Sequence, residues 1–228
     1  MALTVKEFFE KVEHEPALQH GLESFLNAFQ ITEPLPLQMS YEQFLEWADE
    51  DTLAEWQNGE VIMASPASYR HQDLARFLLS VIGIYVETCN AGVIQTAPFQ
   101  MKLASSGREP DLIFVAKSHL DRIKTSYLDG PADLVVEIIS LESVERDRGT
   151  KFVEYEAAAI PEYWLIDPLR NWAEFYQLDD KGRYTPAFAG RQGTYDSPML
   201  PGFSLRVDWL WQMPLPPVLD VLRELKVL

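Results

Sequence analysis

Glu109-Pro110-Asp111 leads directly into the apolar run Leu112-Ile113-Phe114-Val115, and Asp133-Leu134-Val135-Val136-Glu137-Ile138-Ile139-Ser140 repeats this arrangement farther along the chain. Both segments have the composition of buried strands, yet one carries Asp111 and the other Glu137. A buried charge is costly unless it is paired or binds a cation. The two segments therefore predict neighbouring strands whose carboxylates hold something. A hard divalent metal, which prefers oxygen ligands, is the leading candidate.

Lys151 follows Glu137 by fourteen positions, in a segment expected to be helical. Two acids and a lysine around a metal are the groups needed to cut a phosphodiester bond. Each residue also has a plainer interpretation. Asp111 suits a turn residue that caps local backbone, Glu137 suits a structural salt bridge to Arg146 or Lys151, and Lys151 suits a solvated charge.

The composition is that of an ordinary globular protein, with 228 residues, 47% of them hydrophobic and 24% charged. No apolar stretch approaches the ~20 residues of a membrane span, so no membrane partner is expected. The first seven residues lack the basic segment and apolar core of a signal peptide. The single cysteine, Cys89, cannot form an internal disulfide. We therefore expect a protein of the reducing cytoplasm.

The net charge of −16 argues against a nucleic-acid partner, because proteins that bind nucleic acid usually show a basic surface. Only a modest basic cluster, Arg146, Arg148 and Lys151, lies close to the predicted site in the sequence. Such a substrate would have to be engaged through a local basic surface or through the metal.

The chain is expected to have an N-terminal helical appendage at 1–38, one domain at 39–212, and a Pro-rich C-terminal segment with a helix at 213–228. Helices and strands are mixed within the domain, which predicts an α/β or α+β fold with a mixed sheet. Helices are expected at 5–13, 17–29, 41–50, 69–88, 118–123 and 145–159. Strands are expected at 93–103, 111–115, 133–140, 162–166, 172–178 and 183–187, with a tight turn at Asn58-Gly59 and a loop at 104–109.

Several of these segments resemble the Uma-type family of proposed endonucleases (domain of unknown function 820) of the PD-(D/E)XK, or restriction-endonuclease-like, superfamily. The resemblance covers roughly residues 40–210. It rests on Pro110-Asp111, Glu137-Ile138-Ile139-Ser140, Asp147-Arg148-Gly149-Thr150-Lys151, Tyr155 and the specific run Ile160-Pro161-Glu162-Tyr163-Trp164-Leu165-Ile166-Asp167-Pro168. Asn58-Gly59-Glu60, Met63-Ala64-Ser65-Pro66 and His71-Gln72 are similar to the family's N-terminal pattern. One departure is Leu141, where the family often has proline.

The resemblance implies a restriction-endonuclease-like mixed β-sheet flanked by helices, with a Mg²⁺ site, able to accept Mn²⁺, where Asp111 and Glu137 meet. The superfamily's lysine usually lies two positions after the second acid, where this chain has Ile139. Lys151 matches a lysine displaced to the following helix.

The N-terminal pattern supplies two further candidates. Glu60 is implied as a third acid, which ligates the metal or contacts a metal-bound water. The alternative is a hairpin residue that faces solvent. His71 is expected either to hydrogen-bond a metal ligand without touching the metal or to contact substrate. The alternative is a histidine that only hydrogen-bonds nearby backbone at the start of the helix.

The function implied is that of a metal-dependent endonuclease acting on DNA in preference to RNA, as a homodimer that cuts two strands. Two alternatives stay open. One is a catalytically silent interaction protein that keeps the fold, which the acidic charge favours. The other is a metal-dependent hydrolase of small phosphate esters. A Glu137–Lys151 salt bridge without room for a metal would favour the silent protein.

Overall fold

The computed structural model describes residues 38–48, 52, 54–63, 67–141 and 143–228. The helices predicted at 5–13 and 17–29, and nearly all of the predicted appendage, lie outside the described residues. The chain divides into two compact units. One comprises residues up to Ser65 together with Ser105–Arg108, and the other comprises Pro66–Ala104 and Glu109–Leu228. The domain boundaries predicted near residues 38 and 212 stay a prediction.

The first unit contains a short helix and three short strands. Helix α3 (Tyr41–Trp47) begins as its capping-box pattern predicts, because Ser40 and Gln43 exchange hydrogen bonds between side chain and backbone. Strands β1 (Ala54–Gln57) and β2 (Glu60–Met63) form an antiparallel hairpin around Asn58-Gly59. Both turn residues have positive φ, 49° and 94°, as a two-residue hairpin turn requires. The predicted loop at 104–109 is corrected, since β5 (Ser106–Arg108) pairs with β1.

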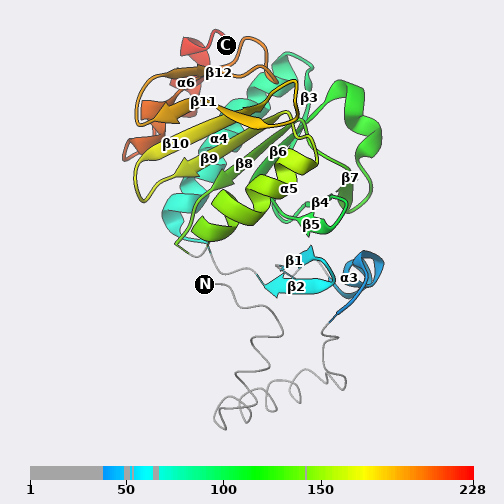
Figure 1. The fold of residues 1–228 in the computed structure, drawn as a ribbon. Coiled ribbons are helices and arrows are strands. Elements are labelled where there is room, and N and C mark those ends of the chain that lie inside the picture. Colours follow the sequence, from blue (N-terminus) through cyan, green and yellow to red (C-terminus); the bar gives the residue numbers. More distant parts are fainter. Residues whose placement is uncertain (1–37, 49–51, 53, 64–66, 142) are drawn as a thin grey trace. The chain divides into compact units, whose positions relative to one another are not determined.

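The second unit is built on a six-stranded sheet with the order β11-β10-β9-β8-β6-β3 (Figure 1). Its strands are β3 (Gly92–Thr96), β6 (Leu112–Ala116), β8 (Leu134–Ile138), β9 (Glu162–Asp167), β10 (Trp172–Leu178) and β11 (Tyr184–Gly190). Strands β8 and β9 are parallel, whereas the other neighbours pair in antiparallel fashion. The mixed sheet predicted from the sequence is confirmed.

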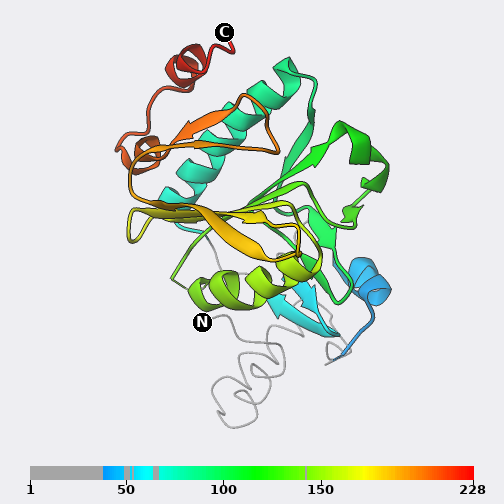
Figure 2. The same ribbon diagram turned by 45° about the horizontal axis from the view of Figure 1, so that its top comes forward.

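Helices cover both faces of this sheet (Figures 1 and 2). On one face lies α4 (Tyr69–Thr88), whose N-cap Ser68 accepts a hydrogen bond from the His71 amide. On the other lies α5 (Lys151–Ala157). Successive side chains along each strand point to opposite faces of the sheet, so the sheet contributes to two apolar cores. The core on the α4 side includes Leu74, Phe77, Phe114, Val136 and Trp164. The core on the α5 side includes Ile113, Val135, Tyr155 and Leu165.

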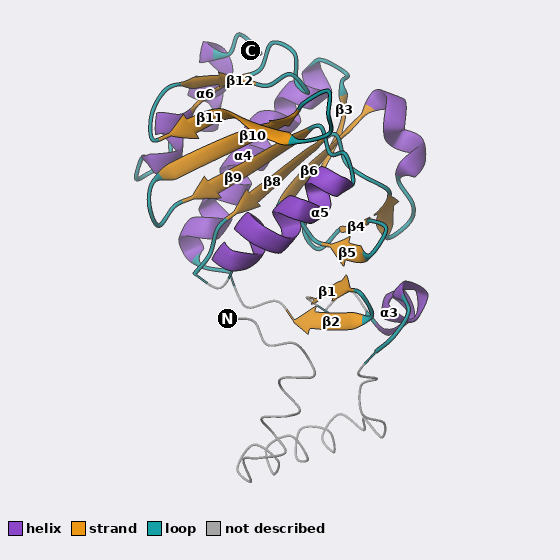
Figure 3. Cartoon of the chain, viewed as in Figure 1, coloured by secondary structure: helices purple, strands orange, loops and turns teal. Residues whose placement is uncertain are grey.

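Two predicted elements are interrupted. The strand predicted at 93–103 divides into β3 and β4 (Gln100–Lys102), with a cis peptide bond between Ala97 and Pro98. The helix predicted at 145–159 begins with a π-helix, η2 (Arg146–Thr150), which continues into α5 (Figure 3). The Lys151 amide consequently donates to the Arg146 carbonyl, five positions earlier.

The remaining elements are short. They are β7 (Tyr127–Asp129), which pairs in parallel with β4, the 3₁₀ helices η1 (Lys117–Arg122) and η3 (Val207–Trp211), the hairpin β12 (Thr194–Asp196) and β13 (Ser204–Arg206), and α6 (Val218–Glu224). Residues of the C-terminal elements share the core on the α4 side of the sheet, and Figure 2 shows them on that side in orange and red. No helix among the described residues is both long enough and apolar enough to cross a membrane.

Candidate metal and phosphodiester site

The strand register brings two of the predicted residues together. Leu112 of β6 pairs with Val136 of β8 in antiparallel fashion, so the next pair outward is Asp111 and Glu137. Directly opposed residues point their side chains to the same face of a sheet. Asp111 is also tied to the neighbouring strand, because its Oδ2 accepts a hydrogen bond of 2.7 Å from the Ile138 amide.

Glu137 is buried, with only 3% of its surface exposed. Its Oε1 accepts a hydrogen bond of 2.9 Å from the Lys151 ammonium and one of 2.7 Å from the Tyr155 hydroxyl. Both donors come from α5. These contacts compensate a carboxylate that would otherwise be costly to bury so deeply.

Lys151 is as deeply buried as its partner, with 2% exposure. The alternative of a solvated lysine is therefore wrong. The Glu137–Lys151 ion pair is the salt bridge expected of a silent protein. It is equally the pair that a metal-free active site would keep, because each charge neutralises the other.

Asp147 is a site residue that the sequence analysis missed. It is 1% exposed, and its Oδ1 lies 3.6 Å from the Lys151 ammonium. Burial raises the pKa of this carboxyl, although the charge of Lys151 and the Ser143 hydroxyl oppose the shift, and the charge of Asp111 adds to it. The signal was available, because an acid four positions before a lysine on a helix reaches the same face.

His71, near the start of α4, approaches the site from the other face of the sheet. Its Nε2 lies 3.2 Å from Asp111 Oδ2. Burial lowers the pKa of His71, but the hydrogen bond and charge of Asp111 and the charge of Glu137 outweigh that effect, so the pKa is raised above its usual value. His71 is thus placed to orient the Asp111 carboxylate, as residues behind metal ligands often do.

Glu60 belongs to the first unit, where it is the half-buried first residue of β2. Its role as a third acid stays a prediction.

The modest basic cluster expected from the sequence provides no open cationic surface. Lys151 is buried against Glu137. Arg148 forms ion pairs with Glu174 and Asp167, and Arg146 lies 4.0 Å from Asp147. All three cations neutralise carboxylates of the same unit.

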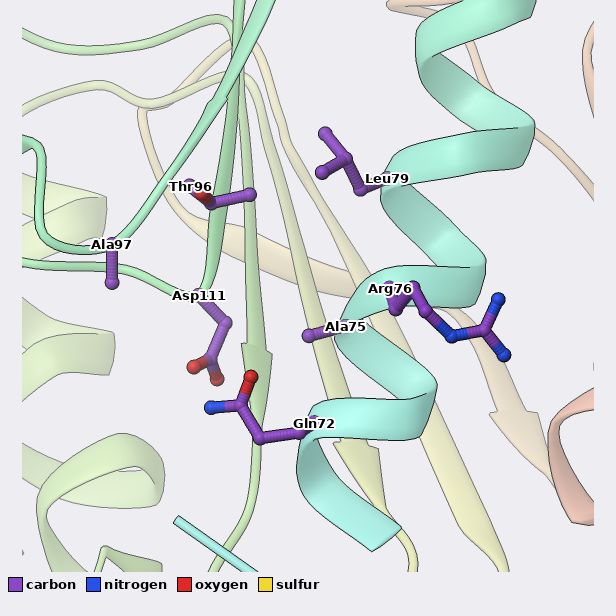
Figure 4. Close-up of a pocket in the computed structure, with 7 residues that line it drawn as sticks. All are labelled: Gln72, Ala75, Arg76, Leu79, Thr96, Ala97 and Asp111. Atoms are coloured by element: carbon purple, nitrogen blue, oxygen red, sulfur yellow. The ribbon is translucent and has the colours of Figure 1, made fainter. Parts of the chain in front are cut away.

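A cavity of about 220 Å³ lies beside Asp111, between α4 and the end of β3. It is lined by Gln72, Ala75, Arg76, Leu79, Thr96, Ala97 and Asp111. In Figure 4 the Gln72 amide points toward the Asp111 carboxylate, whereas the Arg76 guanidinium points away from it. The cavity is half-open to solvent and has room for several water molecules. A ring-sized group could occupy it next to Asp111.

The donor set fits a hard cation in a limited way. Among the described residues, no three His, Cys, Asp or Glu side chains are arranged to hold a metal. Asp111 and Glu137 offer two carboxylates, and Mg²⁺ in phosphate-processing sites commonly takes one or two carboxylates and keeps several waters. The pair therefore suits a cation that shares its coordination between protein, water and substrate.

Comparisons with known proteins agree with this architecture. The family model Uma2, described as "Putative restriction endonuclease", matches residues 41–208. A solved structure of a "putative nuclease belonging to DUF820" from Anabaena variabilis superposes with a TM-score of 0.66 at 16% identity, covering 76% of this chain and 97% of that one. A search of curated proteins finds no match. The predicted family resemblance and the predicted fold class are confirmed.

Proposed function

Because the chain belongs to the Uma2 family, described as "Putative restriction endonuclease", we propose that it is an endonuclease that uses a divalent cation to hydrolyse phosphodiester bonds in DNA. The observation that carries this proposal is the opposition of Asp111 and Glu137 across β6 and β8, with Lys151 paired to Glu137. Acidic side chains at the ends of two buried strands, with a buried lysine beside them, are the groups that metal-assisted phosphoryl chemistry uses.

In this proposal Asp111 and Glu137 hold Mg²⁺ or Mn²⁺. The cation would supply Lewis acidity toward a phosphoryl oxygen and lower the pKa of a bound water. Lys151 stabilises the negative charge that develops on the phosphate, where a buried ammonium acts in a weakly screened environment. His71 keeps the Asp111 carboxylate oriented through its contact at 3.2 Å.

The charge of the chain shapes how substrate would bind. A net charge of −16 repels a polyanion over roughly the Debye length of ~10 Å, and the cations near the site are already paired. Affinity must therefore come from the bound cation and from short-range contacts, including those in the cavity beside Asp111. We propose DNA rather than RNA as substrate, a homodimer that cuts both strands, and a cytoplasmic location.

One observation favours a second candidate, a catalytically silent protein that retains the fold. The Glu137–Lys151 ion pair is complete at 2.9 Å without any cation. A silent protein would keep this pair closed, and a cation would then find no ligand at Glu137.

Plasmid cleavage with Mg²⁺ or Mn²⁺ tests the proposal, together with calorimetric titration of Mn²⁺. Asp111→Asn, Glu137→Gln and Lys151→Gln should each lower the cleavage rate by roughly 10²-fold or more. Asp129→Asn, which alters an exposed carboxylate on β7, serves as the control and should leave the rate unchanged. An inert wild type that binds no Mn²⁺ would establish the silent protein instead.

A further inference from the structure

The proposed site contains an electrostatic conflict. Glu137 accepts a hydrogen bond of 2.9 Å from Lys151, and both residues are almost fully buried. A cation that binds Glu137 competes with this ammonium for the same carboxylate. Separating a buried ion pair is costly when either charge is left without compensation. A working site therefore needs another acceptor for Lys151.

Asp147 has the properties of that acceptor. Its Oδ1 lies 3.6 Å from the Lys151 ammonium, in the π-helix that precedes α5. This Oδ1 is buried and accepts no hydrogen bond from the described residues. A carboxyl oxygen so placed has unused capacity to accept one.

The backbone of Asp147 is held in place. Its amide donates to the Ser143 carbonyl at 2.8 Å, and its carbonyl accepts a hydrogen bond of 3.0 Å from the Tyr163 hydroxyl of β9. The carboxylate is thus carried on a fixed support, and a small movement of the flexible lysine side chain suffices to reach it.

Resting on the proposed function, we infer that Asp147 is a positioning residue that takes over the ion pair with Lys151 when Glu137 binds the cation. The lysine exchanges one carboxylate for another and stays charged within the site. Glu137 is released without leaving a buried ammonium uncompensated. The inference assigns Asp147 neither a contact with the cation nor one with the substrate.

Calorimetric titration of Mn²⁺ into four proteins tests this inference without any assay of activity. The four are the wild type, Asp147→Asn, Lys151→Gln and the double variant. Asp147→Asn should raise the Kd for Mn²⁺ by roughly tenfold, a coupling of ordinary size within one ion-pair network. With Lys151→Gln already in place, the same substitution should change the Kd by less than about twofold.

The outcomes separate the possibilities. Equal weakening in both backgrounds would mean that Asp147 attracts the cation directly, and the inference would be overturned. Unchanged binding in Asp147→Asn would overturn it as well. A wild type that binds no Mn²⁺ would instead remove the proposed function.

Two further proteins guard against a general loss of structure. Asp167→Asn alters another buried carboxylate, one that pairs with Arg148, and should leave the Kd unchanged. Asp147→Ser provides a second route to the same charge removal if Asp147→Asn fails to fold, and it should show the same dependence on Lys151. Melting temperatures measured for each protein identify any variant whose fold is lost.

Discussion

Asp111 accepts a hydrogen bond of 2.7 Å from the Ile138 amide, the residue next to Glu137 on the neighbouring strand. One carboxylate is thereby anchored to the backbone that carries the other. The separation of the two acids consequently depends on strand pairing rather than on a loop. Sites mounted on regular elements hold their geometry better than sites on loops.

His71 should make the stability of the cation-free protein depend on pH. Its pKa is raised above the usual value, because the hydrogen bond and charge of Asp111 outweigh the effect of burial. A raised folded-state pKa stabilises the fold below the unfolded pKa, and this contribution is lost as the pH rises through the folded value. The free energy of unfolding, measured with urea at about pH 5.5 and about pH 8.5, should fall more in the wild type than in His71→Gln. Equal falls in both proteins would contradict this assignment.

Glu162 illustrates a buried carboxylate with a structural role. It is 0% exposed and accepts hydrogen bonds from Trp164, Tyr195, Ser197 and the Met199 amide. Four donors face the Glu162 carboxylate. In Glu162→Gln the side-chain amide would place its own N–H donors against some of them, so hydrogen bonds would be lost. We expect a loss of about 1–3 kcal/mol in the free energy of unfolding at neutral pH.

The same variant tests the pKa of Glu162, which burial raises despite the donated hydrogen bonds. Here the folded state holds its proton more tightly than the unfolded state, so wild-type stability should fall as the pH rises from the unfolded pKa through the folded one. Glu162→Gln should lose this component, while its affinity for Mn²⁺ stays that of the wild type. Urea unfolding of both proteins at several acidic pH values would measure this pH-dependent component of the free energy of unfolding.

Gly92 is required where β3 begins. A Cβ at this position would lie 2.1 Å from the Val115 carbonyl oxygen, which belongs to the paired strand β6. Gly92→Ala should therefore lower the free energy of unfolding by about 3 kcal/mol. Gly83→Ala on α4 is the control, since its Cβ would meet Ile94 at an ordinary 3.5 Å and should gain helix propensity. Thermal unfolding of both variants distinguishes a steric effect from a general cost of adding a methyl group.

The cavity beside Asp111 can be tested by filling it. Ala97 is exposed and lines the cavity, so Ala97→Phe should occupy the space without disturbing the core. We expect the KM for plasmid to rise by roughly tenfold, as loss of a buried substrate contact typically causes, with the Kd for Mn²⁺ unchanged. Ala187→Phe, at an exposed position of β11, should have no effect. Unaltered kinetics in Ala97→Phe would show that substrate does not enter this cavity.

Much of the fold was predictable because its signals are local and periodic. The apolar stripe of α4 and the continuous apolar run of β8 each determine an element by themselves. Asn58-Gly59 predicts a turn because both residues readily adopt the positive φ that a two-residue hairpin turn requires. The break between β3 and β4 was not predicted, although Pro98 marks it, because proline cannot donate to a strand ladder and is rare inside strands.

The site was predictable only in part. Asp111 and Glu137 stand out because each interrupts an apolar run. Asp147 does not, since it lies in a polar segment where a charge usually faces solvent. Its burial arises from tertiary packing against Tyr163, and only the spacing to Lys151 hinted at it.

Residues Arg146–Thr150 form a π-helix directly before α5, so this segment carries one residue more than an α-helix of the same rise. Adding or deleting a residue in a helix turns all that follows by ~100°. Deletion of Gly149 would shorten the spacing of Asp147 and Lys151 from four positions to three and would turn the residues before it relative to α5. Every charged residue of the site would still be present in the sequence. Relatives with a single insertion or deletion in this segment would have the same motif residues at different angular positions around the helix. Aligning their motifs would overlook that change, whereas counting the residues between the two side chains would reveal it.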